Sequence, residues 1–170
     1  FMTQLEQSLA AANTALSYAK EGGSITILNP APAQPLGENI LNLCDFVTPN
    51  EIEAEQITGI PVKSVSDAEV AADKLLEKGA SAAVITLGEQ GALFKDSKQI
   101  IHQPSFQVGP IVETTGAGDA FNGGLAVALA EEMPIDKALR FACATASISV
   151  TRPGTAPSMP DRNEIDTLIT

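Results

Sequence analysis

The stretch VETTGAGDAFNGG, residues 112–124, decides the fold because it leads from an apolar segment into a helix through three small residues. The Gly-Ala-Gly run at 116–118 leaves little side chain over the backbone N–H groups. A helix predicted over 119–131 adds its positive dipole end to the same place. No Lys or Arg occurs from 99 to 136, so these groups supply the only local positive charge. The step therefore predicts an anion site built from backbone amides.

Helical and strand patterns alternate on either side of this step. Apolar residues at three- and four-residue spacing predict helices over about 5–21, 50–58, 66–78, 119–131 and 136–150. Ser66 with Glu69 forms a capping-box pattern for the third of these. Apolar runs predict strands at 24–28, 44–48, 82–86 and 111–112, and a hairpin over 92–102. We expect one α/β domain over residues 1–170, with three layers and a mostly parallel sheet covered by helices on both faces.

The composition excludes several classes of partner. The chain has 10 basic and 21 acidic residues, a formal charge of −11 and 44% hydrophobic residues, which is typical of a soluble globular protein. This charge argues against binding to nucleic acid or to an anionic membrane. Cys44 and Cys143 lie far apart in the sequence, so we expect buried, reduced thiols in a cytoplasmic protein.

Asp119 stands at the end of the Gly-Ala-Gly run and has two interpretations. An Asp at the start of a helix is commonly an N-cap residue. It is also placed to accept a proton from a substrate hydroxyl beside the predicted anion site, which suits phosphoryl transfer to an alcohol. The chain lacks the G-x-x-x-x-G-K-[ST] motif. GAGDAF at 116–121 lacks the third Gly of G-x-G-x-x-G, so a dinucleotide-dependent oxidoreductase is a weaker alternative.

Five segments, taken in order, resemble the ribokinase-like (PfkB) family of sugar kinases. They are NPAPA at 29–33, TPNEIEAEQITG at 48–59, ITLGEQGAL at 85–93, TTGAGDAFNGG at 114–124 and VTRPGTAPSMP at 150–160. The resemblance covers nearly all of the chain. It implies a ribokinase-like α/β fold and an ATP-dependent kinase with a sugar substrate, for which D-ribose, giving ribose 5-phosphate, is the first candidate. Fructokinases, other sugar kinases and nucleoside kinases share these motifs.

The resemblance also implies roles for individual residues. Asp119 would be the catalytic base that contacts the substrate, and the amides of Gly116, Ala117 and Gly118 would form the anion hole. Thr86, Gly88 and Gly91 would lie along ATP. Cys143 would lie where the family's C-terminal helix passes the adenine, and a packed core thiol is the alternative. Glu6 would contact the sugar, and a first-turn helix acid is its alternative.

Two cation sites follow from the same resemblance. Asn50 and Glu53 match an N-x-x-E motif that organises Mg²⁺ and the nucleotide phosphates, whereas the residues alone suggest an ordinary acidic first turn. Glu113, Thr115, Gly154 and Ser158 match a site for K⁺. The family pattern has Asp where this chain has Glu113, which puts activation by K⁺ in question.

The resemblance begins partway through the family's sequence, without the N-terminal half and its lid. We therefore expect weak or no sugar phosphorylation by this chain alone. We also expect association with itself or with a separate N-terminal part, because a sheet cut through its middle exposes an edge strand. The alternative function is a non-catalytic ATP-binding module or a truncated subunit that needs a partner.

Overall fold

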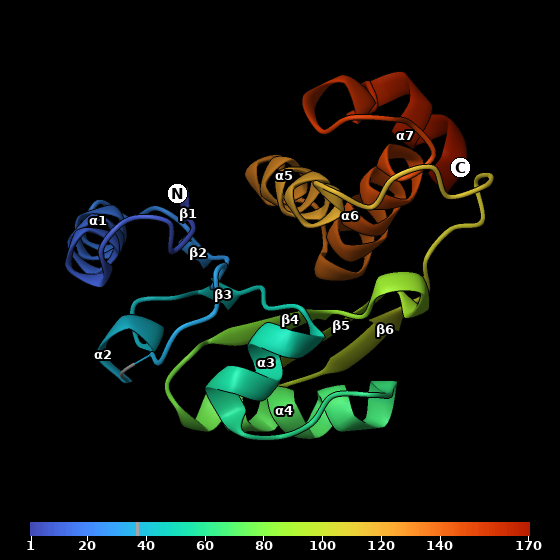
Figure 1. The fold of residues 1–170 in the computed structure, drawn as a ribbon. Helices are drawn as coiled ribbons and strands as arrows, with labels where there is room; N and C mark the ends of the chain where they lie inside the picture. The colour runs from blue at the N-terminus through green and yellow to red at the C-terminus, as the bar shows by residue number, and fades with distance from the viewer. Residues whose placement is uncertain (37) are drawn as a thin grey trace. The chain divides into compact units, whose positions relative to one another are not determined.

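The computed structural model describes residues 1–36 and 38–170, in which six strands form one sheet in the order β1-β2-β3-β4-β5-β6 (Figure 1). The strands are β1 (Met2–Thr3), β2 (Ile27–Leu28), β3 (Phe46–Val47), β4 (Ala82–Thr86), β5 (Ala92–Asp96) and β6 (Ile100–Gln103). The α-helices are α1 (Leu9–Glu21), α2 (Glu38–Leu41), α3 (Glu51–Thr58), α4 (Val65–Glu77), α5 (Ala117–Ala130), α6 (Ile135–Ser149) and α7 (Arg162–Ile169). Short 3₁₀ turns cover Gly88–Gln90 and Ala156–Ser158.

The first four strands are parallel to one another. Met2 pairs with Ile27, Ile27 with Phe46, and Val47 with Ala83. The connections from β4 to β5 and from β5 to β6 are too short for the crossover that a parallel pair requires, so these pairs are antiparallel. The predicted α/β class with a mostly parallel sheet is confirmed.

Contacts divide the chain into two units. The first comprises residues 1–87 and 93–102, and the second comprises residues 88–92 and 103–170. The first therefore contains nearly all of the sheet with α1 to α4, and the second contains α5, α6 and α7. The expectation that residues 1–170 form one domain stays a prediction.

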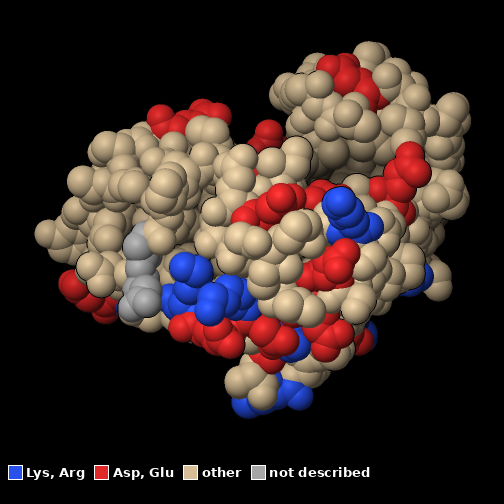
Figure 2. Space-filling model, turned by 60° about the horizontal axis from the view of Figure 1, so that its bottom comes forward, with Lys and Arg blue, Asp and Glu red and all other residues tan. Residues whose placement is uncertain are grey.

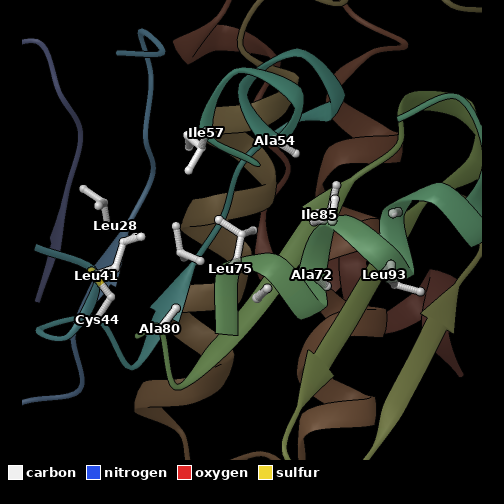
Figure 3. Packing of buried hydrophobic residues seen from close by; sticks show 14 of the residues in the cluster. Leu28, Leu41, Cys44, Ala54, Ile57, Ala72, Leu75, Ala80, Ile85 and Leu93 are labelled. Atoms are coloured by element: carbon white, nitrogen blue, oxygen red, sulfur yellow. The ribbon is translucent and has the colours of Figure 1, made fainter. Parts of the chain in front are cut away.

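The core of the first unit lies between the sheet and its helices. Figure 3 shows Ala72 and Leu75 of α4 over the strands that carry Ile85 and Leu93. Leu75, Ile85 and Ala72 are fully buried. The predicted buried thiol Cys44 belongs to the same cluster, and burial raises its pKa to about 12. At neutral pH it is therefore a protonated packing residue.

Local sequence explains where α3 and α4 begin. Asn50 and Glu53 form a reciprocal capping box at the start of α3, and Gly59 ends that helix in the left-handed conformation. The predicted start of the next helix is wrong by two residues. Ser64, not Ser66, is the N-cap of α4, because its hydroxyl accepts the Asp67 amide at 3.2 Å.

Two further elements differ from the sequence prediction. Residues 111–112 form no strand, since the amides of Val112 and Glu113 both donate to the Val150 carbonyl at the end of α6. These amides are therefore not available to a strand ladder. Helix α7 was not predicted. All three arginines of the chain bond to it or lie in it, through Arg140 to Ile169, Arg152 to Glu164 and Arg162 itself.

Gly124 allows α5 and α6 to pack closely in the second unit. A Cβ built on Gly124 would lie 2.7 Å from Thr145 Oγ1 and 3.1 Å from the Ala142 Cα. The Thr145 hydroxyl is buried and donates to the Phe141 carbonyl at 2.8 Å, so it cannot move aside without losing that bond. Gly124, the last residue of the TTGAGDAFNGG segment, therefore serves the contact between α5 and α6.

We expect Gly124→Ala to lower the free energy of unfolding by about 1–3 kcal/mol through overpacking. Gly123 is the matched control, because a Cβ there meets no atom within 4 Å. Gly123→Ala should leave stability unchanged or raise it by about 0.5–1 kcal/mol, as expected for Gly to Ala in an exposed helix. Urea unfolding of both variants measures the difference, and equal stabilities would contradict the assigned contact.

Charged side chains are interspersed on the face shown in Figure 2, where blue basic groups lie beside red acidic ones. Among the ion pairs of the described residues, the Lys95 ammonium lies 2.7 Å from Asp73 and 3.4 Å from Glu69. None of the helices within residues 1–36 and 38–170 is long and apolar enough to cross a membrane.

Candidate functional site

The loop before α5 has the geometry of a helix N-terminus open to an anion. Gly116 is the N-cap residue and has a φ of 82°, in the left-handed region. The Ala117 amide donates to the Thr114 carbonyl at 3.1 Å, so it is already used within the turn. Of the three amides proposed for the anion hole, those of Gly116 and Gly118 are therefore the better donors.

Asp119 lies in the first turn of α5, and its side chain is exposed. The interpretation of Asp119 as the N-cap residue is wrong, because Gly116 occupies that position three residues earlier. The geometry leaves an accessible carboxylate beside the Gly116–Gly118 loop, as a general base for a bound alcohol requires.

A second loop, residues 150–158, lies against this one. The Glu113 carboxylate accepts the Gly154 amide through Oε2 at 2.7 Å. If Gly116 carried a Cβ atom, that atom would lie 3.1 Å from Thr155 Cγ2 and 3.2 Å from Thr155 Cβ. The resemblance over residues 150–160 implies no role for Thr155. Its contact with Gly116 joins residues 39 positions apart, and no local pattern reveals such a contact.

The residues proposed for K⁺ are partly brought together by these loops. Glu113 and Gly154 are directly bonded, and Thr115 lies in the same loop as Glu113. Ser158 is buried, and its hydroxyl donates to the Thr155 carbonyl at 2.7 Å. Oxygen donors of this kind suit a hard cation. Within residues 1–36 and 38–170, no group of three or more His, Cys, Asp or Glu side chains is placed to hold a metal, so carbonyl and hydroxyl oxygens would have to complete the shell.

In the first unit, Asn50 and Glu53 lie at the carboxyl edge of the parallel strands. Asn50 forms an isolated parallel bridge with Thr86 at the end of β4. The Asn50 Oδ1 accepts the Glu53 amide at 2.8 Å, and the Glu53 Oε2 accepts the Asn50 amide at 2.9 Å. The structure thus brings all three predicted residues together, and it shows that both side chains of the N-x-x-E pair also cap α3.

Burial raises the pKa of the Glu53 carboxyl, against the lowering effect of the Asn50 amide bond, and the nearby Glu51 raises it further. Glu53 is only 9% exposed, and within residues 1–36 and 38–170 no basic side chain forms an ion pair with it, which is unusual for a buried carboxylate. A hydrated Mg²⁺ close by would offset the cost of burying this charge, so the oxygen donors of Asn50, Glu53 and Thr86 fit that ion.

The second unit holds the other residues proposed to lie along ATP. Gly91 has a φ of 91°, and a Cβ on it would lie 2.0 Å from the Gln103 carbonyl oxygen. Gly88 is exposed and accepts the Gly91 amide at 3.0 Å across the 3₁₀ turn. The Cys143 thiol lies 3.8 Å from the same Gln103 carbonyl. Burial raises the pKa of Cys143 to about 12, so its thiol is protonated at neutral pH and is not a nucleophile.

Glu6 lies in a bend after β1 and is exposed. Its interpretation as a first-turn helix acid is wrong, because α1 begins at Leu9 with Ser8 as its N-cap. The neighbouring Leu5 amide donates to the Ala31 carbonyl at 2.8 Å. Glu6 is therefore held at the carboxyl edge of the parallel strands, beside the Pro-rich loop that follows β2.

Comparison with known proteins places the chain in a family. Residues 3–162 match the pfkB family of carbohydrate kinases. The chain is 43% identical over 165 residues to a ribokinase of Haemophilus influenzae, and this match covers 96% of the chain and 53% of the relative. It is 39% identical over 158 residues to a deoxyribokinase of Salmonella typhi, covering 92% of the chain and 51% of the relative.

Solved structures agree with this assignment. The Arabidopsis thaliana ribokinase complexed with ribose and ATP matches 99% of the chain and 55% of its own length, with a TM-score of 0.95 and 30% identity. A Thermotoga maritima ribokinase matches 99% of the chain and 55% of its own length, with a TM-score of 0.86 and 38% identity. The chain therefore spans about half the length of the relatives it matches.

Proposed function

Because the chain belongs to the pfkB family of carbohydrate kinases, we propose that it carries the nucleotide-binding part of a ribokinase-type enzyme. The proposed reaction transfers the γ-phosphoryl group of MgATP to a sugar hydroxyl and releases ADP. One observation supports this most strongly. Gly116 caps α5 in the left-handed conformation, which presents the loop amides at a helix N-terminus with an exposed Asp119 in the next turn.

Each part of this site has a defined role in the proposal. Asp119 accepts the proton of the sugar hydroxyl. The hydroxyl oxygen then bonds to the γ-phosphorus while the bond from the γ-phosphorus to the ADP oxygen breaks. The amides of Gly116 and Gly118, with a shared contribution from the Ala117 amide, stabilise the negative charge on the transferring group. The α5 dipole acts in the same direction. Thr86, Gly88, Gly91 and Cys143 are the residues proposed to lie along the nucleotide.

The cations complete the proposal. Mg²⁺ neutralises charge on the nucleotide phosphates when it is bound. Asn50 and Glu53 would hold its hydration shell while they cap α3, as their oxygen donors allow. Glu113, Thr115, Gly154 and Ser158 are proposed for K⁺. The Gly154 amide donates directly to the Glu113 carboxylate, so this hydrogen bond already links the two loops that a bound K⁺ would also link.

D-Ribose is the first candidate sugar, with ribose 5-phosphate as the product. The Haemophilus relative is a ribokinase, and the Arabidopsis structure is a complex with ribose and ATP. Deoxyribose is the nearest competitor, since the Salmonella relative is a deoxyribokinase. Glu6 is the proposed sugar contact from this chain. We also propose that the chain associates with a second copy or with an N-terminal partner that supplies further sugar contacts.

A non-catalytic ATP-binding module is the second candidate function. Both candidates bind ATP, and only the first transfers phosphate.

Calorimetry with MgATP, together with ADP release measured with and without D-ribose and K⁺, tests the two candidates. Ribose-dependent ADP release supports the kinase, and deoxyribose in a parallel arm ranks the two sugars. ATP binding without ribose-dependent release supports the module. A chain that binds no ATP would contradict both.

A further inference from the structure

Glu113 is fixed at both its backbone and its side chain. The amides of Val112 and Glu113 donate to the Val150 carbonyl at 2.8 and 3.2 Å. The Glu113 carboxylate then reaches the Gly154 amide at 2.7 Å. One residue therefore ties the start of the phosphate-binding loop, residues 113–118, to both ends of the segment 150–154.

The tie continues from Gly154 to the N-cap of α5. Gly154 has a φ of 84°, and the next residue, Thr155, packs against Gly116. The space for a Cβ at Gly116 is already taken by the Thr155 side chain, at 3.1 and 3.2 Å. A shift of Gly154 would therefore move Thr155 and release Gly116 from its contact.

The outer side of this segment is also held. The Arg152 guanidinium forms an ion pair with Glu164 of α7, and its Nη1 lies 3.3 Å from Glu164 Oε2. Both partners are more than one third exposed, so this pair contributes little alone. The bond from the Gly154 amide to the Glu113 carboxylate is also charge-assisted, and it is the one that joins this segment to the start of the loop 113–118.

We propose that Glu113 is a positioning residue for the phosphate-binding loop. Its carboxylate holds Gly154, Gly154 places Thr155 against Gly116, and this sets the direction of the Gly116 and Gly118 amides. The identity of the bound anion as the γ-phosphate of ATP rests on the proposed function. The tie between the loops rests only on the contacts of the second unit.

A positioning role and a purely electrostatic role of Glu113 predict opposite effects on anion binding when its carboxylate is removed. A carboxylate near an anion site repels the anion, so removing its charge should strengthen anion binding if Coulomb energy alone mattered. The positioning role predicts the opposite for Glu113→Ala, which removes the acceptor for the Gly154 amide. Glu113→Gln keeps an acceptor oxygen without the charge, and it should preserve the tie.

Amide hydrogen exchange of residues 114–119 provides the first test, with Glu132→Ala as the control for loss of an exposed acid beyond the end of α5. We expect about tenfold faster exchange in Glu113→Ala, as for the loss of one charge-assisted hydrogen bond, and changes within about twofold in Glu113→Gln and Glu132→Ala. Exchange in Glu113→Ala equal to that of the wild type would overturn the proposal. If Glu113→Ala fails to fold, Glu113→Asp, which shortens the reach by one methylene, carries the same expectation.

Nucleotide binding provides the second test. Glu113→Ala should weaken ATP binding about tenfold and change AMP binding by less than about twofold, because only ATP places a γ-phosphate on the loop. Equal losses for ATP and AMP would indicate a general structural defect and would overturn the positioning role. A wild-type chain that binds no ATP would contradict the proposed function, and hydrogen exchange would still decide whether Glu113 ties the loops.

Discussion

Asp119→Asn is expected to lower ribose-dependent ADP release by about 10²–10⁴-fold, the range for loss of a general base. The carboxamide keeps the size of the side chain but cannot accept the hydroxyl proton. ATP affinity should stay within about twofold or increase, because the substitution removes a negative charge from the first turn of α5. The measurements are ADP release and calorimetric ATP binding on the same preparations.

Asp136→Asn is the matched control. Asp136 is also an exposed acid in the first turn of a helix, α6, so both substitutions carry a similar structural cost. If Asp119 were only a favourable first-turn acid, the two variants would release ADP at the same rate. That result would contradict the assignment of Asp119 as the base.

Gly118→Ala is expected to weaken ATP binding at least about tenfold, with no loss of stability. A Cβ on Gly118 meets no protein atom within 4 Å, and Ala is a better helix former than Gly. Because Cα–Cβ bonds tilt toward the helix N-terminus, the added methyl would occupy the space proposed for the phosphate. Calorimetric ATP titration and urea unfolding measure the two effects separately.

Gly116→Ala adds the same methyl two residues earlier and should behave differently. Its φ of 82° costs about 1–2 kcal/mol for an L-residue, and Thr155 already fills the space. We therefore expect lower stability as well as weaker ATP binding for Gly116→Ala.

If Gly118→Ala bound ATP as tightly as the wild type, the anion would not sit at this helix end, and the proposed function would lose its main support.

The sequence by itself determined the elements whose signals are local. The strand at 82–86 and the helix that Gly59 ends are found where they were predicted, because hydrophobic spacing and a left-handed cap are written in neighbouring residues. The glycines of the 116–118 loop also marked the start of a helix, which the structure places at Ala117 with Gly116 as its N-cap. The resemblance to sugar kinases named the family, which the comparisons confirmed.

The tertiary structure decided what depends on distant partners. Residues 111–112 have the apolar character of a strand, yet their position is set by the Val150 carbonyl, which pairs with Val112 and Glu113. The N-cap of α4 is an exception, because Ser64 is selected by a local contact: its hydroxyl and the Asp67 carboxylate, three residues on, bond at 2.8 Å. Helix α7 begins at a local capping box between Asp161 and Glu164, which the sequence analysis missed. Arg140 of α6 and Arg152 of the following loop then bond to this helix, and those two contacts are long-range.

The same division holds for the candidate site. Sequence placed Glu113 and Gly154 in one group by resemblance, but only the folded chain joins them, at 2.7 Å across 41 positions. It also shows that Glu53 is buried with a raised pKa, and that the Ala117 amide is used within its own turn. Local patterns determine which residues can supply the chemistry. Contacts between loops far apart in the chain determine which atoms are turned toward a ligand, because a hydrogen bond depends on positions that no short stretch of sequence contains.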